Sequence, residues 1–212
     1  MDAAPTFTAF SGTRRLGSGP LHDVAIKAKD ALAVDPKAAI LIFNDRTSEL
    51  TEVDLRGTRN DVRKRLAVSH PVPPAVPAAA PSEPAEEAPR GPGRPKLGVI
   101  AREVTLLPRH WDWLATQRGG ASVTLRRLVD EARRANEGKD RVRKGQEACY
   151  RFMSAMGGNL PGFEEATRAL FAGDAEKLHG LLRAWPTDIA DHVKVLAQAA
   201  MPSSSHNEDP LP

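Results

Sequence analysis

The sequence predicts an α+β protein whose two folded halves are joined by a proline-rich linker. Segments with the two-residue alternation of strands occur before residue 70, whereas apolar residues after residue 100 recur mostly at helical spacing. Between them, residues 71–97 contain nine prolines and few large apolar side chains. Because proline removes backbone donors and favours an extended chain, we expect these residues to form a disordered Pro/Ala-rich spacer.

Residues 1–70 are predicted to form a small domain with the element order β-β-α-β-β-α. Ser11-Gly12 lies between two alternating segments and is a typical hairpin turn. Pro20 favours a helix that starts beside it, and Pro36 disfavours helix at Asp35. The expected strands are 6–10, 13–16, 38–43 and 50–55, and the expected helices are 21–32 and 58–67.

The C-terminal half is predicted to be mostly helical, with one short strand. Residues 98–137 form a first module, in which a strand over 102–107 comes before two helices. Pro108 suits the first turn of the first helix, Gly119-Gly120 ends it, and Ser122 caps the second. The apolar stripe of the second helix contains Leu125, Leu128, Val129 and Ala132.

Two tryptophans of the first module helix cannot share one helix face, because they are two residues apart. Trp111 continues the stripe of Leu107 and Leu114, so we expect it in the core. Trp113 lies toward a flank, where it is either partly buried in the same core or covers a partner.

The rest of the chain is predicted to form a small helical bundle over 138–200 and a disordered tail over 201–212. Gly157-Gly158 is a stop signal, and Asp174 is a cap for the helix that follows it. The expected helices are 141–156, 163–171, 175–185 and 186–199.

Positive charge is concentrated in the segment from Arg90 to Lys144. This segment contains 14 Lys and Arg against 6 Asp and Glu, whereas the whole chain has a formal net charge of only +3. Three opposite-sign pairs at i,i+4 support a helix locally: Arg126/Asp130, Arg127/Glu131 and Asp130/Arg134. The remaining excess is typical of an element that binds a polyanion, although basic tracts also arise on helices that only face solvent.

The basic segment begins with Gly93-Arg94-Pro95-Lys96, which resembles the G-R-P core of the AT-hook. Glycine allows the backbone to approach the floor of a minor groove, proline keeps it extended, and arginine suits the negative potential of a narrow groove. The second arginine of the hook is replaced here by Pro92, with Arg90 two residues further away. The resemblance implies contact with A/T-rich DNA.

The order of strand, Leu107-Pro108, short helix, glycine turn and second helix resembles a ribbon-helix-helix module. In that family two chains pair their strands into a ribbon that enters the major groove. The resemblance therefore implies a homodimer. A helical hairpin with the tryptophans in a small core would produce much the same sequence. The residues that we expect to contact nucleic acid are Arg90, Gly93, Arg94, Pro95, Lys96, Arg102, Arg109, Arg118 and Arg133.

The sequence contains no pattern that supports catalysis or metal binding. The single cysteine, Cys149, excludes an intrachain disulfide and a cysteine-built zinc site, and the six histidines share no metal-ligand spacing. The N-terminal residues lack a signal-peptide pattern, and no apolar run approaches the about 18 residues of a membrane span. We therefore expect a cytoplasmic, non-enzymatic protein without cofactor, metal or membrane contact.

Three segments stand out at full length, together with the helices that follow them: G-R-P-K at 93–96, R-E-V-T-L-L-P-R-H-W-D-W-L at 102–114 and G-G-A-S-V-T-L-R-R-L-V-D-E-A-R at 119–133. With them the chain resembles a bacterial domain-of-unknown-function family, the one numbered 2239. The resemblance implies a bacterial cytosolic protein and no particular activity.

Our functional hypothesis is a DNA-binding protein, regulatory or nucleoid-associated, that acts as a homodimer through the basic central segment. The alternative is a non-enzymatic adaptor that binds a protein partner with its two folded ends. Salt dependence distinguishes them, because counterion release makes nucleic-acid affinity fall steeply with salt.

Overall fold

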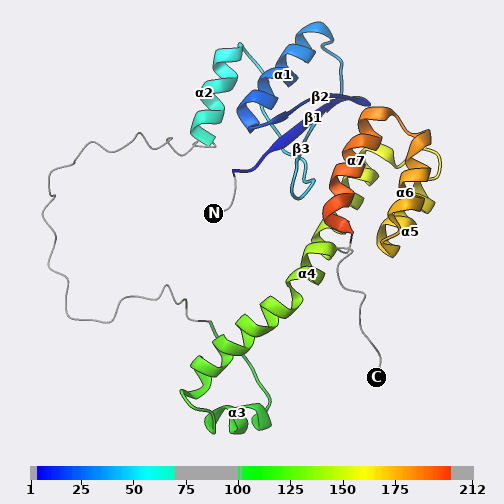
Figure 1. Cartoon of the computed structure of the whole chain (residues 1–212). Coiled ribbons are helices and arrows are strands. Elements are labelled where there is room, and N and C mark those ends of the chain that lie inside the picture. Colours follow the sequence, from blue (N-terminus) through cyan, green and yellow to red (C-terminus); the bar gives the residue numbers. More distant parts are fainter. Residues whose placement is uncertain (1–3, 70–99, 101, 202–212) are drawn as a thin grey trace, which may run out of the picture. The chain divides into compact units, whose positions relative to one another are not determined.

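The computed structural model describes residues 4–69, 100 and 102–201, and the chain divides into two compact units (Figure 1). Unit 1 takes Met1–Val72 together with Ala135–Pro212, and unit 2 takes Pro73–Arg134. The expected linker at 71–97 and the tail from residue 202 lie outside the described residues. Among the described residues, no helix has the length and apolar character needed to cross a bilayer.

Unit 1 starts with a three-stranded antiparallel sheet of order β2-β1-β3, as seen in Figure 1. The strands are β1 (Phe7–Ser11), β2 (Arg14–Gly19) and β3 (Ile40–Asn44), and two helices follow them in the chain, α1 (Leu21–Val34) after β2 and α2 (Arg59–Ser69) after β3. Gly12, with φ of 56°, makes the left-handed turn between β1 and β2. The predicted small N-terminal sheet is confirmed.

Side chains of β1 alternate between two apolar layers, because successive residues of a strand point to opposite faces. Phe7 and Ala9 belong to a core cluster with Val24 of α1 and Val62 of α2. Phe10 belongs to a second cluster that is built mainly from the C-terminal helices. The sheet is therefore covered on both faces.

A fourth strand over 50–55 was predicted, and the structure reduces it to one isolated bridge between Phe43 and Leu50. Thr51 N–H still donates to Ile42 C=O at 2.8 Å, after which the chain leaves the sheet. Val53 and Leu55 pack against the cluster under α1 and α2 instead of extending the ladder. The prediction of a full strand is wrong because these partly buried side chains pack against the helical cluster.

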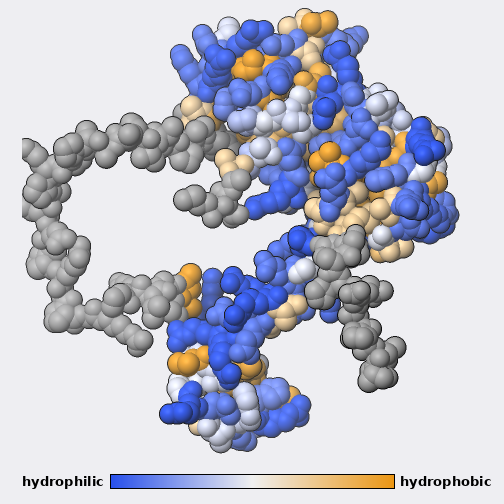
Figure 2. Space-filling view, viewed as in Figure 1, coloured by the Kyte–Doolittle hydropathy of each residue, from blue (hydrophilic) through white to orange (hydrophobic). Residues whose placement is uncertain are grey.

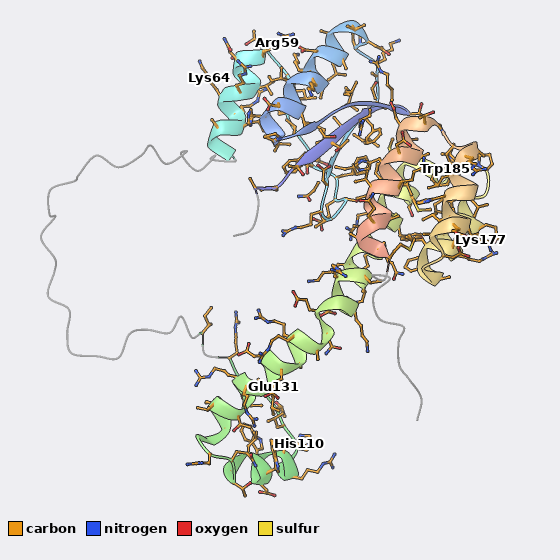
Figure 3. All side chains as sticks on the ribbon, viewed as in Figure 1. Arg59, Lys64, His110, Glu131, Lys177 and Trp185 are labelled. Atoms are coloured by element: carbon orange, nitrogen blue, oxygen red, sulfur yellow. The ribbon has the colours of Figure 1, made fainter. Side chains whose placement is uncertain are left out.

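The C-terminal part of unit 1 is helical, as predicted. It contains the end of α4 (Gly120–Gly157), then α5 (Phe163–Ala172), α6 (Ala175–Leu181), a short 3-10 turn η1 (Leu182–Ala184) and α7 (Thr187–Ala200). The Asp174 side chain caps α6 by accepting from Lys177 N–H at 2.9 Å. Trp185, labelled in Figure 3, donates its indole N–H to Pro161 C=O at 2.8 Å.

The sheet and the C-terminal helices share one core, whereas the sequence placed residues 1–70 and 138–200 in separate domains. Phe10 and Phe43 lie 5.3 and 5.0 Å from Phe152 of α4, measured between ring centroids. His192 of α7 lies 4.5 Å from the same Phe152 ring. Because the strand periodicity places Phe10 on the face away from α1, the C-terminal helices cover an apolar face that would otherwise be exposed.

Helix α4 passes through Gly138 without a break, whereas the sequence predicted separate helices on either side of it. Glycine inside a helix costs about 1 kcal/mol relative to alanine, which lowers stability without forcing an end. Two glycines of α4 have very different surroundings. A Cβ on Gly138 would meet no described atom within 4 Å, but one on Gly145 would lie 2.5 Å from the backbone of Ala199 in α7.

The described part of unit 2 consists of an extended segment, helix α3 (Pro108–Ala115) and the start of α4. Leu107 is extended (φ −68°, ψ 149°) and Pro108 opens the helix as predicted, while Gly119 and Gly120 make the turn with φ of 88° and 74°. No strand is assigned at 102–107 within the described residues, which differs from the prediction. A strand requires a hydrogen-bonded neighbour, and this single chain supplies none there among the described residues.

Replacement of Gly138 and of Gly145 in α4 by alanine should change the free energy of unfolding in opposite directions. Gly145→Ala should lower the free energy of unfolding by about 1–3 kcal/mol, because the methyl group would displace the α7 backbone. Gly138→Ala should raise it by up to about 1 kcal/mol, since it gains helix propensity and meets no neighbour. Urea denaturation of both variants measures this, and an equal effect of the two substitutions would contradict the close α4–α7 crossing.

Acidification should destabilise the shared core through His192. His192 is 5 % exposed, and its Nε2 has no hydrogen-bond partner among the described residues. Burial lowers the pKa of His192. The charge of Asp45 acts in the opposite direction, and the charge of Arg15 lowers this pKa further. The unfolded chain therefore binds the proton of His192 more tightly than the folded chain does. As the pH falls below about 6.5, the free energy of unfolding should decrease, by at most about 1.4 kcal/mol per pH unit.

The variant His192→Phe tests this assignment, because it keeps an aromatic ring beside Phe10 and Phe152 but cannot titrate. Urea denaturation midpoints between pH 7 and pH 5 should fall in the parent protein and stay flatter in the variant. Parallel pH dependences in the two proteins would show that other groups are responsible.

Candidate nucleic-acid interface

Four of the arginines that the sequence assigned to nucleic-acid contact are described, and all four are exposed. Arg102 lies in the extended segment, Arg109 in the first turn of α3, Arg118 in the turn after α3, and Arg133 on α4. Within the described part of the chain, none of their side chains has a hydrogen bond or ion pair. A guanidinium without an intramolecular partner keeps all its donors for an external anion such as phosphate.

Other arginines of unit 2 have partners within α4. Arg127 Nη1 lies 3.6 Å from Glu131 Oε1, so this predicted i,i+4 pair is confirmed. Arg126 Nε donates to Ser122 C=O at 3.1 Å, and Arg134 Nε donates to Asp130 C=O at 3.2 Å. The predicted pairings of Arg126 and Arg134 with the Asp130 carboxylate are thus replaced by bonds to carbonyls one turn earlier.

Many surface cations of unit 1 are held in ion pairs. Arg59 of α2, labelled in Figure 3, lies 2.7 Å from Asp30, and Lys194 lies 2.9 Å from Asp191. The side chain and backbone of Arg56 donate to Asp54 and hold the pKa of that carboxyl below its usual range. Exposed cations without an ion pair among the described residues also occur in unit 1, for example Arg63, Lys64 and Arg183. The arginines of unit 2 are therefore distinguished by their place in the basic segment and not by the lack of a partner alone.

The hook-like residues of the sequence analysis lie outside the described residues. They are Arg90, Gly93, Arg94, Pro95 and Lys96. Of the residues expected to contact nucleic acid, the structure therefore describes only Arg102, Arg109, Arg118 and Arg133.

Unit 2 also contains a cavity of about 260 Å³ with an apolar lining. Three segments form its wall, namely the extended segment, α3 and α4, and Figure 3 marks the position of His110 on α3. The lining residues are Leu106, His110, Trp113, Leu114, Leu125 and Leu128. None of them is a carboxylate, lysine or arginine.

The prediction that Trp111 lies in the core is wrong, whereas the partial burial expected of Trp113 on a flank is not contradicted. Trp111, which the sequence placed in the core, is 44 % exposed and is not part of the cavity wall. Trp113, which it placed on a flank, lines the cavity and is still 48 % exposed. Only Leu114 of the predicted α3 stripe is buried, because α4 packs on one side of α3 and nothing described covers the other.

The described residues contain no group of three His, Cys, Asp or Glu side chains that could hold a metal ion. Cys149 lies inside the shared core of unit 1 with no exposed surface, and this burial raises its pKa to about 12. The thiol is therefore protonated at neutral pH and lacks the thiolate that nucleophilic attack requires.

The cavity is the feature that sequence reasoning missed. Leu125 and Leu128 were assigned to a helix stripe, but their meeting with Trp113 across the glycine turn depends on the packing angle between α3 and α4. A signal was present in Trp113 itself, since a large aromatic residue off the main stripe has to find a partner elsewhere.

Comparison with known proteins supports a family assignment without an activity. The model of an uncharacterised protein family conserved in bacteria, DUF2239, matches residues 6–197. Comparisons with curated proteins and with solved structures returned no match. Because the match includes the sheet, the basic segment and the C-terminal helices as far as residue 197 in α7, the chain belongs to the DUF2239 family of uncharacterised bacterial proteins.

Proposed function

We propose that this protein binds DNA in the bacterial cytoplasm, in a regulatory or nucleoid-associated role, through the basic segment that includes unit 2. The observation that supports this most directly is the set of four exposed arginines that find no partner among the described residues. Phosphate contacts supply most of the affinity of sequence-independent DNA binding, and arginine meets phosphate through two parallel hydrogen bonds.

The arrangement of unit 2 is consistent with the ribbon-helix-helix resemblance in its helices. An extended segment leads into α3 at Pro108, and a two-glycine turn leads into α4. In the proposed complex, residues 102–107 of two copies pair as strands and approach a groove of the duplex. This pairing would satisfy backbone groups that have no bonding partner within the described part of one chain.

Residues 93–96 are proposed to add a minor-groove contact with A/T-rich DNA. The reason is the sequence Gly-Arg-Pro-Lys. Its glycine has no side chain to keep the backbone away from the groove, and its proline favours an extended backbone beside the arginine. The second candidate function, a protein adaptor, is favoured by the apolar cavity of unit 2, since apolar concavities bind protein side chains more readily than DNA.

Loss of the arginines without partners should weaken DNA binding and its salt dependence. The double variant Arg109→Ala/Arg118→Ala should reduce the slope of log affinity against log salt by about two, one for each lost phosphate contact. Fluorescence anisotropy with a labelled duplex at several salt concentrations gives this slope. The matched control is Arg168→Ala in unit 1, an exposed arginine paired with Glu165, which should leave the slope unchanged. No binding by the parent protein at low salt would reject DNA binding and leave the adaptor function.

Arg94→Ala should weaken binding to A/T-rich duplex more than binding to G/C-rich duplex. The physical reason is that the lost side chain would occupy a narrow, electronegative minor groove, which A/T tracts provide. Arg133→Ala is the matched comparison, because a phosphate contact from α4 should be lost equally on both sequences. Paired titrations at fixed ionic strength measure the difference, and equal losses for Arg94→Ala would remove the minor-groove contact from the proposal.

A further inference from the structure

The middle of α4 is a helical stretch without a core. Among the described residues, Thr124 and Gly145 are buried, but none of the twenty residues between them is, and residues 126–139 are all exposed. At 1.5 Å per residue, such a stretch of α-helix is about 30 Å long. Glu131, labelled in Figure 3, lies in it, and Figure 2 shows mainly blue hydrophilic side chains along its visible face. Burial of side chains therefore contributes little to the stability of this part of α4.

Intrinsic helix propensity does not compensate for the missing core. Helices in proteins gain most of their stability from an apolar face packed on another element, and isolated helices are marginal in water. The stretch contains Asn136 and Gly138, which are both poor helix formers. Gly138 has no packed neighbour, because a Cβ there would meet no described atom within 4 Å. The helix therefore needs another source of stability, and Gly138 is where it opens most easily.

Charged side chains of the stretch supply that source. Residues 126–144 contain eight Lys and Arg and four Asp and Glu, and each of these four acidic residues has a Lys or Arg four positions away. Side chains at this spacing lie next to each other on one face of a helix. A helix that is polar on all sides is stable when many such pairs support it.

Interactions of this kind are formed within α4. Arg127 lies 3.6 Å from Glu131. Arg143 lies 3.1 Å from Asp140 and 3.3 Å from Glu147, and all these side chains are between 49 and 61 % exposed. The bonds of two further arginines to carbonyls one turn earlier, described above, also stay within the helix. Because the ion pairs are exposed, dissolved salt screens them.

We infer that residues 126–144 of α4 form a charged helix that is supported by its own side chains and opens locally, from Gly138, as the ionic strength rises. The Debye length falls from about 10 Å at 0.1 M salt to about 3 Å at 1 M. One i,i+4 pair changes the helix equilibrium by about twofold, so several pairs together change it by several-fold. The boundary between the two units follows Arg134, so this opening makes the two ends of α4 unfold separately. The opening needs no DNA and is independent of the proposed function.

Hydrogen exchange of the full chain without DNA, measured by mass spectrometry, tests the local opening. Amides of residues 129–140 should exchange at least about threefold faster at 1 M than at 0.1 M NaCl, because the ion pairs are screened. Amides of residues 148–156 are the internal reference, since this segment carries the buried Cys149 and Phe152 and exchanges only when the core opens. Their exchange should be slower at both salt concentrations and should depend much less on salt.

Two glycine variants locate the opening. Gly138→Ala should slow the exchange of residues 129–140 about fivefold at both salt concentrations, because alanine favours the helix and its methyl group meets no neighbour. Gly145→Ala is the matched control in the same helix. Its methyl group would meet the α7 backbone, so it should speed the exchange of residues 148–156 and leave that of 129–140 unchanged.

A charge variant tests the source of stability. Glu131→Gln should speed the exchange of residues 129–135 at 0.1 M NaCl by about twofold and reduce its salt dependence, because Arg127 loses its partner. Glu165→Gln on α5 removes an exposed partner of Arg168 in unit 1, and it should leave the exchange of residues 129–140 unchanged.

Three results would overturn the inference. Equal protection of residues 129–140 and 148–156 would show that another part of the protein packs on the stretch. Exchange of residues 129–140 at the rate of an unstructured chain at 0.1 M NaCl would show that the helix does not form there. Exchange that responds neither to salt nor to Gly138→Ala would show that charge pairs and Gly138 do not control the opening.

Discussion

The packing of Phe10 and Phe43 against Phe152 and His192 is the contact on which unit 1 depends. A three-stranded sheet with one helical layer would leave Phe10 and Phe43 in water, and burial of each large apolar side chain is worth about 1.5–3 kcal/mol. The helices that provide this burial lie more than 90 residues further along the chain. Residues 4–69 and the C-terminal helices are therefore parts of one folding unit.

This architecture makes residues 73–134 an insertion between two parts of unit 1. Both ends of the insertion are anchored, one after α2 and the other within α4, and the cost of closing such a loop increases only slowly with its length. A long proline-rich segment is therefore compatible with a stable unit 1. The insertion also carries the basic segment and the apolar cavity, so the features linked to binding are concentrated in the part with the smallest core.

Unit 2 carries two kinds of exposed side chain. The arginines favour contact with anions, because they have no partner within the described residues, and the exposed apolar side chains favour contact with protein, because little inside the unit covers them. The proposed DNA-binding function would use the arginines, whose side chains would face phosphate. The adaptor function uses the apolar side chains alone and leaves the unpaired arginines without an explanation.

The sequence by itself determined the local elements: the hairpin at Gly12, the helix start at Pro108, the cap at Asp174 and the concentration of basic residues between Arg90 and Lys144. These depend on backbone preferences and charges that act over a few residues. Only the tertiary structure decided that 50–55 leaves the sheet, that α4 continues through Gly138, and that Trp113 rather than Trp111 lines a cavity. Each of these depends on which distant segment packs against the residue, and hydrophobic periodicity identifies the apolar face of an element without identifying its partner.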